Sequence, residues 1–156
     1  VDLVRVGSAQ EMLEAAQAAL PAAVFVGAAA VADYRPQEVA PTKIKKGANE
    51  WTVTFVRNPD IVAQIAAHTP RPYMVGFAAE TEDLIRHGRQ KLVAKHLDLV
   101  AANLIGQPGS GLEEETNALT LIDHRGEQSL PRAAKPVLAE QLVSEILRRW
   151  KPQTGS

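Results

Sequence analysis

Residues 23–31, Ala-Val-Phe-Val-Gly-Ala-Ala-Ala-Val, are continuously apolar. A half-exposed strand alternates apolar and polar residues, whereas an unbroken apolar run is typical of a parallel strand that is covered on both faces. Residues 73–79, Tyr-Met-Val-Gly-Phe-Ala-Ala, have the same character, and so do residues 97–102, Leu-Asp-Leu-Val-Ala-Ala, apart from Asp98. We therefore predict core strands at all three places, in a mainly parallel sheet.

Helical patterns alternate with these strands. Ser8-Ala-Gln-Glu11 has the spacing of a capping box, which predicts a helix to about Leu20. Asn58-Pro59 supplies an N-cap followed by proline at the first helical position, and Thr81 can cap a later helix. Further helices are predicted over residues 59–68, 82–96 and 136–150.

The remaining segments complete an α/β prediction. We expect short strands at residues 1–6 and 51–56, and a hairpin from residues 117–122 and 128–130. Residues 32–50 and 106–112 are predicted loops. The result is a Rossmann-like three-layer fold with a mainly parallel sheet, plus a C-terminal β-hairpin and helix. Residues 1–150 are expected to form a single domain and residues 151–156 a tail.

The amino-acid composition argues against several classes of function. With 17 basic and 18 acidic side chains in 156 residues, the net charge of −1 lacks the basic excess of a nucleic-acid binder. The chain has no cysteine, which excludes disulfides, thiolate metal sites and cysteine nucleophiles. Its four histidines have no metal-ligand spacing. We expect no nucleic-acid partner and no structural transition metal.

Neither a membrane span nor an export signal is expected. The sequence contains no run of 18 apolar residues. Its first residues have no basic segment followed by an apolar core. Together with the absence of cysteine, this favours a cytoplasmic protein.

The predicted fold indicates where a ligand would bind. Ligands of open parallel sheets bind outside the carboxyl ends of the strands, where helix amino termini favour anions. The sequence contains neither G-x-G-x-x-G nor G-x-x-x-x-G-K-[ST], so the usual dinucleotide and Walker loops are absent. The residues that we expect at this edge are Gly7-Ser8, Ala32-Asp33, Glu80-Thr81 and Asn103.

Two features near this edge have alternative interpretations. Asp33 could hold Mg²⁺ on a polyphosphate, or it could be a turn aspartate that bonds its own backbone. Lys43, Lys45 and Lys46 could clamp phosphate groups, or they could form a solvated charge run.

The second half of the chain leaves similar alternatives. Lys91 and Lys95 lie four residues apart, so an anion between them would relieve their repulsion, although both could simply complement the helix carboxyl end. Phe77 could stack on a base or belong to the core. Gly76 beside it could mark close approach of a ligand.

Five motifs in order carry a resemblance to a known family. The chain is similar to the synthetase part of the phosphopantothenoylcysteine synthetases, also called phosphopantothenate-cysteine ligases, of the bacterial coenzyme A pathway. It looks like the carboxyl-terminal part of a bifunctional protein. The motifs are Gly27-Ala-Ala-Ala-Val-Ala-Asp-Tyr-Arg35, Pro41-Thr-Lys-Ile-Lys-Lys46, Asn58-Pro-Asp-Ile61, Val75-Gly-Phe-Ala-Ala-Glu-Thr81, and Lys91-x-x-x-Lys95 followed by Asp98-Leu-Val-Ala-Ala-Asn103.

The resemblance implies a two-step ligation. In this family the carboxylate of 4′-phosphopantothenate attacks CTP, giving an acyl-cytidylate and pyrophosphate, and the amino group of L-cysteine then displaces CMP. Mg²⁺ accompanies the CTP. The resemblance also implies a homodimer. Many members carry a flavin-dependent decarboxylase upstream, and we expect no flavin in this chain.

The resemblance also assigns site residues. Lys43 would stabilise charge around the acyl-cytidylate as the catalytic residue, and Asp33 would support the metal. Lys91 and Lys95 would bind the phosphates, while Phe77 would contact base and ribose. The full CTP-contacting set implied is Gly27, Ala28, Ala29, Asp33, Lys43, Pro59, Asp60, Ile61, Val62, Phe77, Lys91 and Lys95.

One departure from the family opens a competing hypothesis. Members carry an Asn…Ser-Ser-Gly-Lys segment before the matching region, which helps bind phosphopantothenate, and this sequence does not contain it. The chain could therefore be a catalytically incomplete CTP-binding or dimerisation fragment. A nicotinamide oxidoreductase, suggested by the fold class alone, is disfavoured by the missing glycine fingerprint.

Overall fold

The computed structural model describes residues 1–43, 45, 47, 50–105 and 114–150. The chain forms two compact units, Val1–Leu20 with Ala29–Ile61, and Pro21–Ala28 with Val62–Ser156. We call the first the arm unit and the second the sheet unit, and each is described by itself. The single domain expected over residues 1–150 stays a prediction, and the predicted loop 106–112 and tail 151–156 lie outside the described residues.

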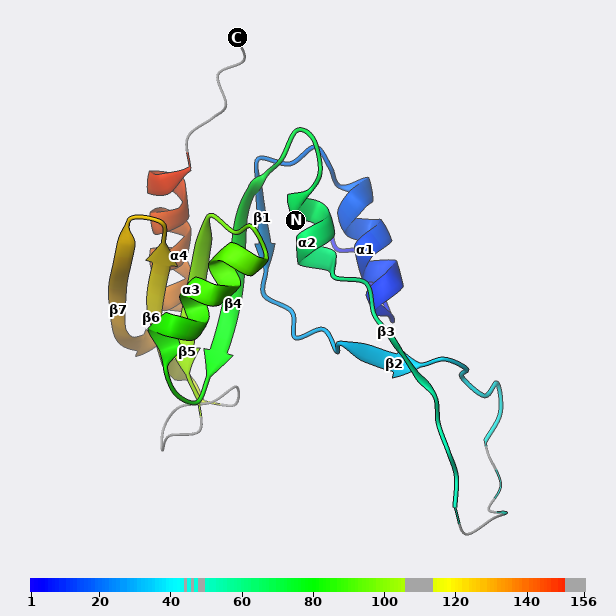
Figure 1. Ribbon diagram of the computed structural model, residues 1–156. Coiled ribbons are helices and arrows are strands. Elements are labelled where there is room, and N and C mark those ends of the chain that lie inside the picture. The colour runs from blue at the N-terminus through cyan, green and yellow to red at the C-terminus, as the bar shows by residue number, and fades with distance from the viewer. Residues whose placement is uncertain (44, 46, 48–49, 106–113, 151–156) are drawn as a thin grey trace. The chain divides into compact units, whose positions relative to one another are not determined.

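The sheet unit is built on a mixed sheet (Figure 1). β4 pairs in parallel with β1 on one side and with β5 on the other, and β6 and β7 continue the sheet as an antiparallel hairpin. This confirms the predicted α/β fold with its C-terminal hairpin. In spatial order the strands are β1 (Val24–Gly27), β4 (Tyr73–Glu80), β5 (Leu99–Leu104), β6 (Thr116–Asp123) and β7 (Gly126–Ala134).

One face of the sheet packs against α4 (Lys135–Arg149). Leu138, Leu142 and Ile146 recur at helical spacing and are buried. They share a hydrophobic cluster with Leu99, Leu121 and neighbouring strand residues. Alternate residues of the strands point to this face, so they and the buried residues of α4 form one hydrophobic core.

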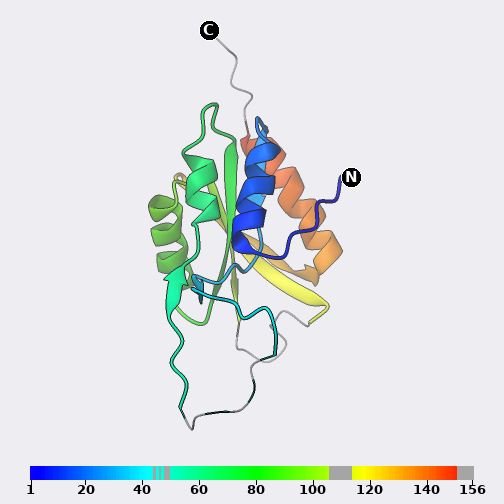
Figure 2. The same cartoon turned by 90° about the vertical axis from the view of Figure 1, so that its right-hand side faces the viewer.

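The other face packs against α3 (Leu84–Ala94), so the sheet unit has three layers (Figure 2). Gly88 of α3 lies so close to Ile122 and Ala102 that a Cβ on it would overlap the Ile122 side chain. A Cβ on Gly76 would come within 2.6 Å of Leu97 Cδ1. The close approach that we associated with a ligand at Gly76 is therefore made by Leu97.

The arm unit contains α1 (Ala9–Ala18) and a two-stranded ribbon of β2 (Tyr34–Pro36) and β3 (Phe55–Arg57). The predicted cap of α1 is confirmed, because Ser8 Oγ accepts a hydrogen bond from the Glu11 N–H at 3.2 Å. The Glu11 carboxylate accepts from the Gly7 N–H at 2.7 Å. The Gln37 N–H donates to Thr54 O at 2.9 Å and extends the ribbon by one step.

Several predicted boundaries are wrong for local reasons. Residues 1–6 form no strand, and residues 28–31 do not continue β1, because neither segment pairs with a described strand. The ribbon interrupts the loop predicted at 32–50, and β3 begins at Phe55 because β2 is only three residues long. Asp83, with φ of 47°, precedes α3, so the helix begins later than the Thr81 cap predicted.

Among the described residues, no helix has both the length and the apolar composition that crossing a bilayer requires.

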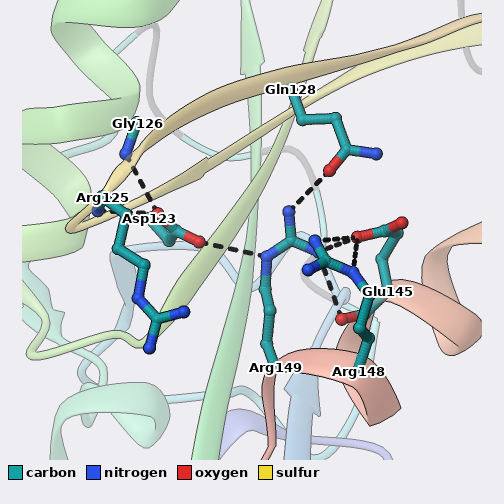
Figure 3. Close-up of polar contacts among 7 residues, drawn as sticks. All are labelled: Asp123, Arg125, Gly126, Gln128, Glu145, Arg148 and Arg149. Atoms are coloured by element: carbon teal, nitrogen blue, oxygen red, sulfur yellow. Dashed lines mark hydrogen bonds and ion pairs between the residues drawn. The ribbon is translucent and has the colours of Figure 1, made fainter.

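A polar network anchors the end of α4 to the β6–β7 turn (Figure 3). Arg149 Nε donates to Asp123 Oδ2 at 3.0 Å, and Nη2 donates to Gln128 Oε1 at 2.8 Å. Arg149 also pairs with Glu145, one turn earlier on the helix. Hydrogen bonds from Arg148 and Arg149 lower the pKa of Glu145 to about 2. The contribution of Glu145 to this network is therefore present only while its carboxylate is ionised.

We predict that Glu145→Gln reduces the acid sensitivity of folding. A folded pKa below the unfolded value of about 4.3 gives stability that is present above about pH 5 and is lost as the pH falls toward about 2. Between these limits the wild-type chain should lose about 1 kcal/mol more unfolding free energy than the variant. Urea denaturation at several pH values measures this. Glu140→Gln, an exposed change on the same helix, is the control, and equal pH slopes for wild type and Glu145→Gln would contradict the prediction.

Candidate functional site

The carboxyl ends of three parallel strands define one edge of the sheet unit. Glu80 ends β4, and its Oε2 lies 3.0 Å from Nδ1 of His87 in the first turn of α3. The Ile105 N–H donates to Glu80 O at 2.9 Å, just past the end of β5. These contacts fix the edge where a parallel sheet binds its ligands.

Gly27 ends β1 level with Gly76 of β4, and α2 (Ile61–Ala66) explains why residue 27 is a glycine. A Cβ on Gly27 would lie 3.0 Å from Val62 Cγ2 and 3.7 Å from Val75 O. The missing side chain therefore lets α2 approach the strand. Ala28 follows and is exposed. The structure thus brings together Gly27 and Val62, two predicted CTP contacts.

Phe77 and Lys91 also meet, but from opposite faces of the sheet. The Phe77 ring packs against the cluster that α4 covers. Lys91 Nζ, on α3, donates to Phe77 O at 2.5 Å. Lys95 lies one turn further along α3 and is half-buried. The predicted base contact and phosphate contacts are thus separated by the strand itself, and a nucleotide that touched both would bend around the carboxyl edge.

In the arm unit, Asn58 connects two of the motifs. Its Nδ2 donates to Ala32 O at 2.8 Å, and its backbone N–H donates to Asp33 O at 2.8 Å. Arg35 Nη1 donates to Asn58 Oδ1 at 3.1 Å and to Arg57 O at 2.9 Å. The predicted N-cap role of Asn58 is therefore wrong, because its side chain bonds to the preceding loop and α2 begins only at Ile61.

The Asp33 carboxylate is exposed in this arrangement. Among the described residues, no group of three or more His, Asp or Glu side chains could hold a metal ion. Mg²⁺ is commonly bound through one or two carboxylates together with substrate phosphates. Asp33 therefore fits the role of a single protein ligand to an ion that a nucleotide brings with it.

Lys43 and Lys45 are exposed in the segment between the two strands of the ribbon, and Lys46 lies outside the described residues. A groove of about 890 Å³ runs beside this segment within the arm unit. Pro36, Val39, Trp51 and Phe55 contribute apolar lining. No described contact fixes the Lys43 side chain, so its catalytic role stays a prediction.

The predicted CTP-contacting residues are divided between the two units. The arm unit holds Ala29, Asp33, Lys43, Pro59, Asp60 and Ile61, and the sheet unit holds Gly27, Ala28, Val62, Phe77, Lys91 and Lys95. In the sheet unit Gly27 meets Val62 and Phe77 meets Lys91. In the arm unit Asn58 links the Asp33 segment to Pro59, which follows it in the chain. The common role of the CTP-contacting set remains a prediction.

Two structural roles were missed by the sequence analysis. Arg35 lies in the first quoted motif, yet nothing in the pattern indicated that it bonds to Asn58. Asp98, in the fifth motif, accepts hydrogen bonds from the Met74 N–H at 2.7 Å and from Arg71 at 3.2 Å. Asp98 lies where β4 and β5 begin, so its place in the motif is explained by strand pairing at the edge opposite the predicted ligand.

Comparison with known proteins gives long sequence matches. The chain is 45% identical over 150 residues to the coenzyme A biosynthesis bifunctional protein CoaBC of Vibrio vulnificus strain CMCP6. It is 48% identical over 131 residues to the protein of the same name from Escherichia coli K12. These matches cover 94% and 81% of this chain, but the chain spans only 37% and 32% of the two relatives.

Solved structures agree with the sequence matches. The crystal structure of the C-terminal domain of a CoaBC protein has a TM-score of 0.71 at 29% identity, covering 92% of this chain and 63% of that one. The DNA/pantothenate metabolism flavoprotein of Streptococcus pneumoniae has a TM-score of 0.72 at 18% identity, covering 96% and 72%. The second likeness supports the fold alone. Residues 1–149 match the family described as the DNA/pantothenate metabolism flavoprotein C-terminal domain, and the chain belongs to that family.

Proposed function

We propose that this chain is the CTP-binding part of a ligase in coenzyme A biosynthesis. The reaction joins 4′-phosphopantothenate to L-cysteine through an acyl-cytidylate, with release of pyrophosphate and then CMP. The observation that carries the proposal is the series of five motifs, which spans most of a chain whose family membership is shown. The names of the bifunctional relatives support the same pathway.

The chemistry explains why the proposed reaction needs a nucleotide. A free carboxylate is a poor electrophile, whereas a mixed anhydride with CMP has a good leaving group. The phosphopantothenate carboxylate attacks the α-phosphorus of CTP and pyrophosphate leaves. The cysteine amine then attacks the acyl carbon and CMP leaves. Bound Mg²⁺ would offset the charge of the triphosphate.

The described residues suit these roles in different ways. Asp33 offers an exposed carboxylate for the ion. Lys91 uses one N–H of its ammonium on Phe77 O, which leaves two for phosphate oxygens. Lys43 would stabilise charge around the acyl-cytidylate, and closure of its segment would exclude the water that hydrolyses anhydrides.

Two further proposals concern the oligomeric state and a domain fused upstream. We propose that the protein is a homodimer and that a flavin-dependent decarboxylase precedes this chain. The word "bifunctional" in the relatives' names supports a second activity in the same polypeptide. The second candidate function is a CTP-binding or dimerisation module without catalysis. It is favoured by the small share of the bifunctional relatives that the chain spans, 37% and 32%.

We predict that Lys91→Gln and Lys95→Gln each weaken CTP binding about tenfold at low salt and less at high salt, because salt screens charge-assisted contacts. Lys91→Gln should also lower stability slightly, since it loses the bond to Phe77 O. Isothermal titration at two salt concentrations, with melting curves of the free variants, measures both effects.

Arg86→Gln is the matched control for this pair. Arg86 lies on the same helix and pairs with Asp83 at the surface, so its loss should leave CTP affinity nearly unchanged. An equal loss of affinity in the control, or losses of equal size at both salt concentrations, would contradict a phosphate-binding role.

We predict that the 156-residue chain binds CTP yet releases pyrophosphate far more slowly than a polypeptide extended upstream to include the Ser-Ser-Gly-Lys segment. The upstream segment would orient the acyl substrate, and lost orientation is worth several kcal/mol of barrier. In the extended polypeptide, Lys43→Gln should slow turnover more than it weakens CTP binding.

Steady-state pyrophosphate release, with phosphopantothenate and cysteine present, separates the two candidate functions. Turnover by the extended polypeptide alone supports a ligase whose acyl-binding half lies upstream. Equal rates from both polypeptides would show that the upstream segment is dispensable, and the division of the site would have to be abandoned. Turnover by neither would favour the binding module.

A further inference from the structure

The backbone conformation of Asp33 is restricted by contacts from a segment distant in the sequence. Asp33 lies in no helix or strand, immediately before β2. In a regular element, the ladder of main-chain hydrogen bonds fixes φ and ψ, and thereby the direction of each Cβ. Asp33 lies outside such a ladder, so contacts with residue 58 restrict its φ and ψ instead.

Asn58 holds both peptide groups that flank the Asp33 Cα. Its Nδ2 donates to Ala32 O, the carbonyl of the peptide that precedes Asp33, at 2.8 Å. Its main-chain N–H donates to Asp33 O, the carbonyl of the peptide that follows, at 2.8 Å. With both flanking carbonyls held, rotation about the two backbone bonds of Asp33 is restricted, and the direction of its Cα–Cβ bond is defined.

Arg35 completes the arrangement by holding Asn58 itself. Its Nη1 donates to Asn58 Oδ1 at 3.1 Å, which orients the amide so that Nδ2 faces Ala32 O. The same Nη1 donates to Arg57 O at 2.9 Å. Both ends of the Asn58 amide are therefore bonded within the arm unit.

The position of Asn58 in the chain extends its effect to a second motif. Pro59 follows directly, and its ring fixes φ near −65°. Asn58 therefore ties the Asp33 segment to the start of the Pro59–Ile61 segment, and both are predicted CTP contacts. A displacement of the Asn58 amide would move them relative to each other.

We propose that Asn58, oriented by Arg35, is the positioning residue that presents the Asp33 carboxylate to the metal ion of a bound nucleoside triphosphate. This inference rests on the proposed function and deepens it. Asn58 and Arg35 need not touch the nucleotide, since they act through Asp33. Their loss should lower the part of CTP affinity that depends on Mg²⁺ and spare the metal-free part.

A double-mutant cycle tests the inference on the full 156-residue chain. The probe is CTP, titrated with and without Mg²⁺, against wild type, Asp33→Asn, Asn58→Ala and the double variant. We expect each single change to weaken the Mg²⁺-dependent binding about tenfold, the usual effect of losing one polar contact. We expect the double variant to be no more than about twofold weaker than Asp33→Asn alone, because residues that act as a unit are not additive.

Asn117→Ala is the matched control. Asn117 is also a half-buried asparagine, but its Oδ1 accepts from the adjacent Ala118 N–H in β6 and so holds no second segment among the described residues. Its loss should leave CTP binding unchanged in either condition. If Asn58→Ala does not fold, Arg35→Gln replaces it in the cycle, since that change releases the Asn58 amide and leaves residue 58 intact.

The outcomes separate this inference from the function on which it rests. If wild type binds CTP but the two losses multiply in the double variant, Asn58 is merely structural and the inference is overturned while the proposed function stands. If Asp33→Asn leaves Mg²⁺-dependent binding intact, the inference is overturned as well. If wild type does not bind CTP, the proposed function fails and the inference fails with it.

Discussion

The sheet unit depends on the pairing of β4 with a parallel strand on each side. β4 is the middle of the three parallel strands, and Met74, Val75 and Ala78 are buried. Because parallel strands run in the same direction, β1 ends with Gly27 beside Gly76, and β4 runs on to Glu80 at the carboxyl edge. The helices α3 and α4 cover its two faces, so the carboxyl edge is where polar groups and a ligand can meet.

Elements with a strong, self-contained pattern could be predicted from the sequence. The strand predicted at residues 73–79 is observed as Tyr73–Glu80, and the helix predicted at 136–150 as Lys135–Arg149. The strand predicted at 1–6 was wrong because a strand also requires a partner, which a local pattern does not reveal. The direction of Phe77, whose ring joins the α4 cluster, likewise depends on sheet pairing.

The candidate site was harder to predict because its loops are held by long-range polar contacts. Asn58-Pro59 is a good local signal for a helix start, yet the Asn58 side chain bonds to Ala32, 26 residues earlier. A single hydrogen bond between distant residues produces no periodic pattern in the sequence. The motifs indicated candidate residues for the site, whereas the geometry indicates how Arg35 and Asn58 give an irregular segment a defined shape.

We propose that the residues of the five motifs bind CTP, and thermal melting of the chain tests this most directly. A ligand that binds only the folded state stabilises it in proportion to the logarithm of its concentration above Kd. The account predicts that CTP with Mg²⁺ raises the melting temperature progressively with concentration, and that NADH at the same concentrations does not. A melting temperature that is unchanged by CTP and Mg²⁺, or that rises with NADH instead, would contradict it.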